Sequence, residues 1–220
     1  MEQIKLKLND SDNFFVKEAY NVLRTNLQFC GKDVKIIAIT STNENEGKST
    51  ISLNVAQSFA ELGKRVLFID ADMRKSVIVS RHTNQKNLNG LSEVLSGQCA
   101  LNECVFKCQV PNLNLLFSGH YPPNPAELLS SKYFAKLLEE SRKYYDYVIV
   151  DTPPLGRVID AAAIAAFCDG VAVVINGNLT KCREAKTVVE QLQKSGCTIL
   201  GAIRNCVTVK SAKYYKKYQK

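Results

Sequence analysis

Apolar and polar positions along this chain follow two alternating patterns. Six runs rich in Val, Ile and Leu predict buried β-strands, at residues 34–41, 65–70, 112–119, 145–151, 170–176 and 197–205. Apolar residues at helical spacing predict α-helices at residues 14–29, 47–62, 125–144, 160–168 and 184–194. Apolar strands that alternate with helices form parallel sheets covered on both faces. We therefore expect an α/β fold with a mostly parallel central sheet and helices on both faces.

The first predicted helix, at residues 14–29, is amphipathic. Its apolar side is expected to consist of Phe15, Ala19, Val22, Leu23 and Leu27. A helix of this kind normally buries such a side against the rest of the domain or against another chain.

The length of the chain, 220 residues, suits one α/β domain. We assign residues 1–208 to that domain and residues 209–220, rich in Lys and Tyr, to a flexible tail. The formal net charge of +8 favours anionic partners. Because four of the positive charges lie in the last ten residues, we do not expect the body of the domain to bind nucleic acid.

The eight cysteines are scattered and include no CxxC pair, which favours a reducing, cytoplasmic compartment over a disulfide framework. Cys104, Cys108 and His120 have a poor spacing for a metal site. The first ten residues lack the apolar segment of a signal peptide. The longest apolar run, at 161–175, is interrupted by Asp169 and Gly170, so we expect no membrane span.

A strand, a polar loop and a helix follow one another in VKIIAITSTNENEGKSTISLNVA, which is the setting of a phosphate-binding loop. Gly47 allows backbone N–H groups to approach a phosphate, Lys48 can reach the β- and γ-phosphates, and Ser49 can ligate Mg²⁺. The usual motif, GxxxxGK[ST], begins with glycine, where this chain has Thr42. Asn45 also replaces a common glycine, but Asn adopts the left-handed conformation more readily than most residues. We expect nucleotide contacts from Thr42, Asn43, Glu44, Asn45, Glu46, Gly47, Lys48, Ser49 and Thr50.

Two of the predicted strands end in carboxylates. VLFIDADMR places Asp70 and Asp72 two residues apart and Arg74 after them, and YDYVIVD ends in Asp151. Ligands of parallel α/β sheets bind beyond the carboxyl ends of the strands. Carboxylates at that edge, beside a phosphate-binding loop, can coordinate Mg²⁺ and accept a proton. The sequence therefore predicts a nucleotide site with carboxylates at its base.

Taken in order, these segments resemble the bacterial tyrosine kinases of capsule and exopolysaccharide synthesis, in particular the separate cytoplasmic kinase of Firmicutes-type systems. The resemblance covers almost the whole chain and rests on EAYNVLRTNLQF, ITSTNENEGKST, VLFIDADMRKS, GLSEVLSGQ, NLNLLFSGHYPPNPAELL, YDYVIVDTPP and the Lys/Tyr tail. It implies a P-loop NTPase fold and a non-specific protein-tyrosine kinase. Such a kinase transfers the γ-phosphate of MgATP to tyrosines in its own C-terminal cluster, here Tyr214, Tyr215 and Tyr218.

The resemblance also implies roles for individual residues. The expected catalytic residues are Lys48, Asp70, Asp72 and Asp151, and the expected Mg²⁺ ligands are Ser49, Asp70 and Asp151. In this scheme Lys48 stabilises the transferring phosphate and Asp70 acts as the base toward the tyrosine hydroxyl. Asp72 supports the metal and phosphate shell, and Asp151 orients the metal directly or through water. Arg74 and Asn205 are added to the nucleotide contacts, Asn205 as an adenine contact.

Two positions depart from the family pattern. The ExxRxxR pattern that builds a ring of subunits is matched by Glu18 and Arg24, but its middle position is Asn21. Losing one arginine removes charge-assisted hydrogen bonds from that interface, so we expect weaker homo-oligomerisation. Ser76 stands where family members commonly have a proline after the DADMRK segment, and we expect this difference to have little effect on the protein.

By resemblance, the expected partners are the cytoplasmic segment of a transmembrane chain-length regulator, acting as activator, and a cognate tyrosine phosphatase. The expected location is the cytoplasm, with recruitment to the inner face of the plasma membrane by that adaptor.

Two other functions share much of this sequence evidence. Walker-type ATPases of the partitioning and cell-division-positioning class have the same fold. They usually carry an early lysine in a KGGxGK loop, where this chain has Asn43, and they lack a terminal tyrosine cluster. The second is an ATP-gated scaffold for a membrane adaptor, in which phosphate transfer is incidental.

Overall fold

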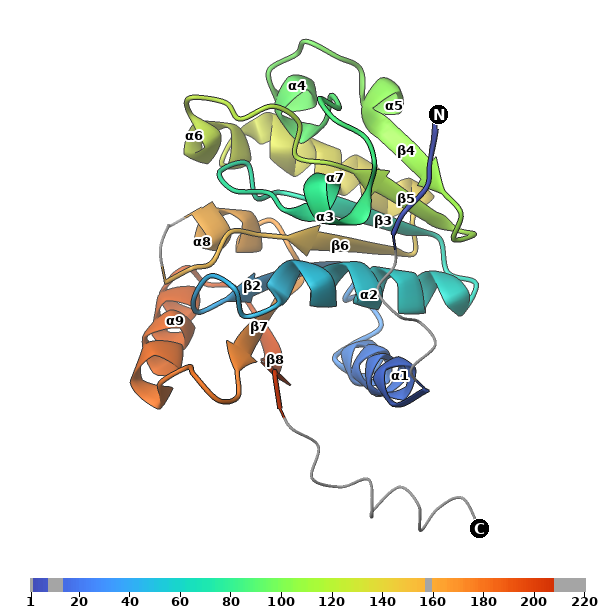
Figure 1. Ribbon diagram of the computed structural model, residues 1–220. Helices are drawn as coiled ribbons and strands as arrows, with labels where there is room; N and C mark the ends of the chain where they lie inside the picture. The colour runs from blue at the N-terminus through green and yellow to red at the C-terminus, as the bar shows by residue number, and fades with distance from the viewer. Residues whose placement is uncertain (1, 8–13, 157–159, 208–220) are drawn as a thin grey trace.

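The computed structural model describes residues 2–7, 14–156 and 160–207, and its centre is an eight-stranded sheet (Figure 1). The strand order is β1-β4-β5-β3-β6-β2-β7-β8. Among the described strands β4 and β5 pair antiparallel, and all the other neighbours pair parallel. The predicted mostly parallel α/β fold is confirmed.

The strands of the described residues are β1 (Gln3–Ile4), β2 (Ile36–Ser41), β3 (Val66–Asp70), β4 (Val105–Cys108), β5 (Leu113–Leu116), β6 (Tyr147–Asp151), β7 (Gly170–Asn176) and β8 (Ile199–Asn205). The helices are α1 (Phe14–Phe29), α2 (Lys48–Glu61), α3 (Ile78–His82), α4 (Leu91–Leu95), α5 (Leu101–Cys104), α6 (Pro125–Leu129), α7 (Lys132–Tyr144), α8 (Asp160–Ala165) and α9 (Cys182–Lys194).

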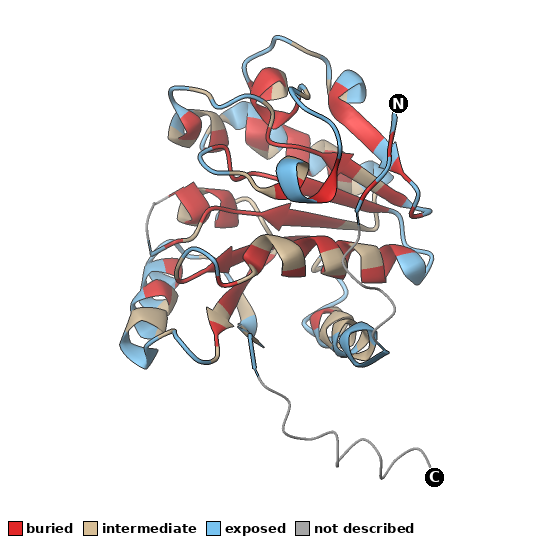
Figure 2. Ribbon diagram, in the orientation of Figure 1, coloured by how far each residue is buried: buried red, intermediate tan, exposed pale blue. Residues whose placement is uncertain are grey.

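Consecutive strand residues point to opposite faces of the sheet, and each face has its own core. Ile37 and Phe68 pack with residues of α2, whereas Ile36 and Leu67 pack with residues of α7. As a result, α1, α2 and α3 cover one face and α4 to α9 cover the other (Figures 1 and 2). Burial on both sides explains why the central strands are almost wholly apolar.

One predicted element is wrong: the single helix expected at 125–144 is two helices, α6 and α7. The backbone turns at Ser130, and Ser131 then caps α7, since its hydroxyl accepts a hydrogen bond from Phe134 N at 3.2 Å. The prediction also missed the short elements β1, α3, α4, α5 and β4. Elements of two to five residues are too short to show a periodicity, and the tertiary contacts determine them.

The apolar run at 161–175 divides where expected. The Asp169 carboxylate accepts hydrogen bonds from Lys35 N at 2.8 Å and Ile36 N at 2.7 Å, which separates α8 from β7. Within the described ranges, no helix is both long and apolar enough to cross a membrane.

The apolar side predicted for α1 is only partly buried. Leu27 is buried and Leu23 packs against the core, but Phe15 is 52% exposed, Val22 is 50% exposed and Ala19 is also exposed. The helix predicted at 14–29 is confirmed as α1, and only part of its apolar side is buried within the chain. The helix packs on α2 through the side that carries Leu23 and Leu27, so the other apolar residues face outward (Figure 2).

The ring-pattern residues of α1 are engaged within the chain. Arg24 Nη1 donates to Asn21 Oδ1, to Ser58 O and to Ser58 Oγ, at 2.9 to 3.0 Å. Asn21 Nδ2 donates to Glu18 Oε2 at 3.4 Å. In this structure Arg24 therefore ties α1 to α2.

Candidate functional site

The loop between β2 and α2 has the backbone that a phosphate-binding loop needs. Asn45 has a φ of +61° and Gly47 a φ of +86°, both in the left-handed region. Asn45 thus adopts the left-handed conformation that a glycine commonly provides at this position, as its residue type allows. At Gly47 the space is also restricted, because an added Cβ would lie 2.2 Å from Asn205 Nδ2.

Glu46 holds this loop from within. Its buried carboxylate accepts hydrogen bonds from Thr42 N at 2.9 Å and Asn43 N at 3.0 Å, and it contacts the Thr180 hydroxyl. Asn205 Nδ2 donates to the backbone oxygen of Glu46 at 2.8 Å. The carboxylate thus orders the segment where the usual first glycine is missing, and Asn205 connects the loop to β8.

The ends of β3 and β6 bring two carboxylates side by side. Asp70 and Asp151 are register partners in the parallel pair, and both are fully buried. Asp72 lies two residues beyond Asp70 and is 7% exposed. The predicted convergence of these carboxylates at one edge of the sheet is therefore seen in the structure.

Lys48, the first residue of α2, reaches into this group. Its Nζ donates to Asp151 Oδ1 at 2.9 Å and to Ser49 Oγ at 3.0 Å, and lies 3.9 Å from Asp72 Oδ2. Ser52, one turn further along α2, donates to the same Asp151 oxygen at 2.8 Å. One ammonium group thus faces several buried carboxylates.

The electrostatics of the site reflect that imbalance. Burial raises the pKa of Asp70 to about 7, with a further increase from the charge of Asp151, while Ser76 and Lys48 oppose the change. The pKa of Asp72 is also raised, mainly by burial, with Lys48 acting in the opposite direction. The site is therefore short of positive charge in the absence of further cations.

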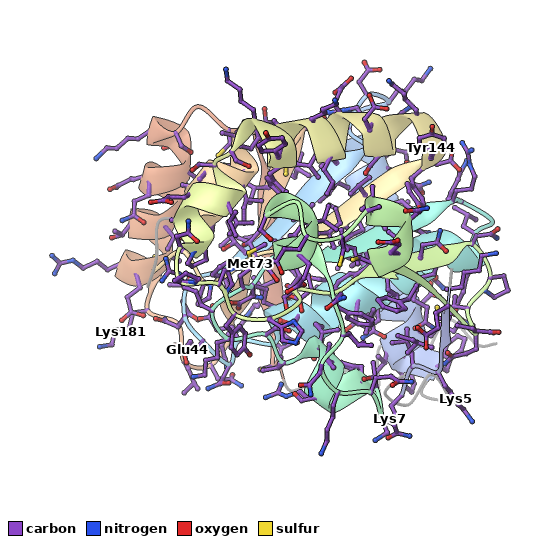
Figure 3. The ribbon with its side chains drawn as sticks, turned by 90° about the horizontal axis from the view of Figure 1, so that it is seen from above. Lys5, Lys7, Glu44, Met73, Tyr144 and Lys181 are labelled. Carbon is purple, nitrogen blue, oxygen red and sulfur yellow. The ribbon has the colours of Figure 1, made fainter. Side chains whose placement is uncertain are left out.

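Charged residues next to the phosphate-binding loop and the end of β3 form ion pairs. Arg74 makes a two-point contact with Asp160, Nε to Oδ2 at 2.6 Å and Nη2 to Oδ1 at 3.1 Å. Lys75 Nζ pairs with Glu44 Oε2 at 2.7 Å, joining the segment after β3 to the phosphate-binding loop. Figure 3 shows Glu44 at the same side of the molecule as Lys181, at the start of α9.

A pocket opens over these groups. It is lined by Ser41, Asn43 to Thr50, Asp72, Arg74, Lys75, Val77, Arg81, Pro153 and Pro154. Most of the predicted nucleotide contacts lie in this lining. In the described part of the chain Thr42, Asp70 and Asp151 lie beneath the lining rather than in it, and Asn205 lies behind the loop.

Some predicted residues fall outside this geometry. Tyr214, Tyr215 and Tyr218 lie outside the described residues. His120 Nδ1 is 3.0 Å from Glu93 Oε1, and among residues 2–7, 14–156 and 160–207 no group of three or more His, Cys, Asp or Glu side chains could hold a metal.

The sequence interpretation missed several side chains that contact the predicted set, among them Ser52, Asp160 and Ser76. Ser52 follows Lys48 by one helical turn, a spacing that could have indicated a shared face. Asp160 and Ser76 reach Arg74 and Asp70 only through the fold, and no local pattern marks them.

The chain matches the AAA domain family over residues 34–197. The septum site-determining protein MinD of Pyrococcus horikoshii OT3, in complex with Mg-ADP, has the same fold, with a TM-score of 0.63, 22% identity, and coverage of 77% of this chain and 69% of that one. Similarity at that level shows the fold alone, so the cell-division-positioning ATPases are only distant matches.

Much closer similarity is found to tyrosine kinases. The tyrosine-protein kinase CpsD of Streptococcus agalactiae is 43% identical over 206 residues, 93% of this chain and 90% of that protein. The tyrosine-protein kinase YwqD of Bacillus subtilis (strain 168) is 41% identical over 192 residues, 86% of this chain and 80% of that protein. The kinase domain of the Escherichia coli tyrosine kinase ETK superposes with a TM-score of 0.87 at 33% identity, covering 92% of this chain and 80% of that one. With this similarity along nearly its whole length, and with a phosphate-binding loop facing paired buried carboxylates, the chain belongs to the bacterial tyrosine-protein kinases.

Proposed function

We propose that this protein binds MgATP and transfers its γ-phosphate to the tail tyrosines Tyr214, Tyr215 and Tyr218 of a neighbouring copy, and that this reaction regulates capsular or exopolysaccharide synthesis. The observation that carries the proposal is the juxtaposition of Lys48 with Asp70 and Asp151 beneath a phosphate-binding loop. Membership in the tyrosine kinase family supports the identity of the acceptor.

The residues present fit a magnesium nucleotide. Asp151 Oδ2 is buried and has no hydrogen-bond partner among the described residues, so it is free to accept one more ligand. Ser49 and Asp151 would hold Mg²⁺, and Asp70 would be a further ligand. This ion usually binds one or two carboxylates together with waters and phosphate oxygens. When bound, the metal neutralises charge on the phosphates.

Phosphoryl transfer mainly requires positioning and charge neutralisation. Nucleotide binding would draw the Lys48 ammonium from Asp151 toward the phosphates. The tyrosine oxygen then forms a bond to the γ-phosphorus while the bond to the β–γ bridging oxygen breaks, and ADP leaves. Asp70 accepts the tyrosine proton, and its pKa of about 7 suits a base that works near neutral pH.

The remaining roles rest on the family. Thr42 to Thr50 and Arg74 would surround the nucleotide, Asp72 would support the phosphate shell, and Asn205 would approach the adenine. The activator would be the cytoplasmic segment of a transmembrane chain-length regulator, which would also bring the protein to the inner face of the membrane. A cognate phosphatase would reverse the reaction.

Phosphosite mapping of the full chain after incubation with MgATP tests the proposal. Replacing Tyr214, Tyr215 and Tyr218 together by Phe should remove the phosphotyrosine signal, whereas Tyr133→Phe, at a 73% exposed tyrosine outside the tail, should not. Unchanged phosphotyrosine in the triple variant would refute transfer to the tail tyrosines.

Transfer between copies can be tested by mixing two variants. A Lys48→Met chain has the tail but no activity, and the triple Phe variant has activity but no acceptors. Phosphotyrosine on the Lys48→Met chain is expected only in the mixture. Adding the cytoplasmic segment of the activator should increase the rate, and an equal rate with and without it would refute the activator role.

A further inference from the structure

Ser76 lies in the segment between β3 and α3, beside the candidate site. Its hydroxyl donates a hydrogen bond to Asp70 Oδ2. The sequence comparison suggested little consequence for serine at this position, but the structure places its side chain on the expected base.

The Asp70 carboxylate depends on few contacts for its orientation. It is fully buried, and Oδ1 accepts a hydrogen bond from Asp72 N at 3.2 Å. Within the described residues, Ser76 is the side chain that hydrogen-bonds to the other oxygen. A carboxylate oxygen has two lone pairs, so this bond leaves Oδ2 able to accept a second hydrogen.

Ser76 is itself held from two sides. Ile78 N donates to Ser76 Oγ at 3.3 Å, and Ile78, the first residue of α3, is fully buried in the core. The Tyr121 hydroxyl donates to the backbone oxygen of Ser76 at 3.3 Å. The Ser76 hydroxyl is therefore presented to Asp70 by a backbone anchored in the core and by the segment after β5.

We propose that Ser76 is a positioning residue that holds the Asp70 carboxylate in the orientation in which Oδ2 receives the tyrosine proton. The inference rests on the proposed function, in which Asp70 is the base. Loss of the hydroxyl would leave one carboxylate oxygen free to turn. Because a misplacement of about 1 Å can cost roughly 100-fold in rate, we expect Ser76→Ala to lower kcat by about 10- to 100-fold.

The effect should be confined to the chemical step. Among the described residues, the pocket lining includes Lys75 and Val77 but not Ser76. The KM for ATP and the affinity for a fluorescent ATP analogue should therefore stay within about twofold. Ser76→Thr retains a hydroxyl and should restore kcat to within a few fold of the original chain.

The alternative is that Ser76 only supports the start of α3 through its contact with Ile78 N. Ser80→Ala is a matched control, since Ser80 lies in the same short helix, is exposed and donates to Val77 O at 3.1 Å. This control should leave kcat, KM and nucleotide affinity unchanged.

A thermodynamic cycle without nucleotide tests the contact separately from the activity. The urea midpoint is measured for the full chain, Ser76→Ala, Asp70→Ala and the double variant. Ser76→Ala should lower the midpoint in the original background and have a smaller effect when Asp70 is already Ala. If the two substitutions change the urea midpoint additively, the contact between Ser76 and Asp70 is refuted, whatever the kinetic results are.

The kinetic arm distinguishes the two levels of inference. If the original chain forms no phosphotyrosine with its activator, the proposed function fails, while a non-additive cycle would still support the contact. If the original chain is active and Ser76→Ala has the same kcat, or if Ser76→Thr is as impaired as Ser76→Ala, the positioning role is refuted.

Discussion

Replacing Asp70 by Asn should make the nucleotide-free protein more stable at alkaline pH while removing the proposed base. Asp70 is fully buried next to Asp151 and close to Asp72, and Lys48 is the cation that contacts this group. Asn has nearly the same shape and carries no charge, and its single amide oxygen can accept the hydrogen bond from Ser76 or the one from Asp72 N, but not both. The variant therefore removes a buried negative charge without opening a cavity.

The magnitude follows from the pKa of Asp70. Burial raises this pKa from 3.8 to about 7 in the folded protein, so the folded state binds the proton more tightly than the unfolded state. Stability is therefore lost as the pH rises from the unfolded value through the folded one. A difference of about 3 in pKa corresponds to roughly 4 kcal/mol at pH 8, which is an upper limit because Asn forms weaker hydrogen bonds. We expect a gain of about 1–3 kcal/mol.

Thermal unfolding in EDTA without nucleotide measures this gain. For a chain of this size, about 1–3 kcal/mol corresponds to a rise in Tm of roughly 3–10 °C at pH 8. At pH 5 the loss is smaller, because this pH lies only a little above the unfolded pKa of 3.8 and well below the folded one, so the gain in Tm should be less than half of that at pH 8. Asp33→Asn, at an exposed position, is the control and should not change Tm at either pH. An equal gain at both pH values, or none at pH 8, would refute the reasoning.

Three further outcomes are expected. Lys48→Met should abolish phosphotyrosine formation while the fold is retained by circular dichroism, and residual turnover with MgATP would mean that the site is wrongly assigned. Gly47→Ala combines a φ of +86° with a Cβ 2.2 Å from Asn205 Nδ2, so its affinity for a fluorescent ATP analogue should fall at least tenfold. Gly63→Ala, at a φ of +81° with no neighbour within 4 Å, should bind the analogue normally. Phe59→Ala removes a fully buried ring and should lower the free energy of unfolding by about 3–5 kcal/mol in urea titration.

The strands that carry the site could be predicted because their signals are local. β2, β3, β6 and β7 are buried on both faces, so each is a continuous apolar run, and the carboxylates that end β3 and β6 interrupt those runs abruptly. The edge strand β1 and its neighbour β4 gave no such signal. They contain two and four residues, and their pairing joins segments about 100 residues apart.

The helices show the same division. For α2 the prediction of residues 47–62 nearly matches Lys48–Glu61, because a phosphate-binding loop marks its start. For α1 the apolar residues could be identified, but not which of them are buried. That choice depends on α2, against which Leu23 and Leu27 pack while Phe15 and Val22 face outward.

The amino-acid sequence by itself determined the class of fold, the phosphate-binding loop and the carboxylates expected around it, since each is written in a short contiguous segment. The tertiary structure decided how these groups interact. It made Asp70 and Asp151 neighbours across β3 and β6, and it brought Ser76 onto Asp70. It also joined Asn205 to the loop through Glu46. These contacts connect residues that are far apart or lie on separate elements, and no periodicity along the chain encodes them. The distances between these groups are set only when the strands pair and the helices pack on the sheet. The same packing buries Asp70 and so raises its pKa.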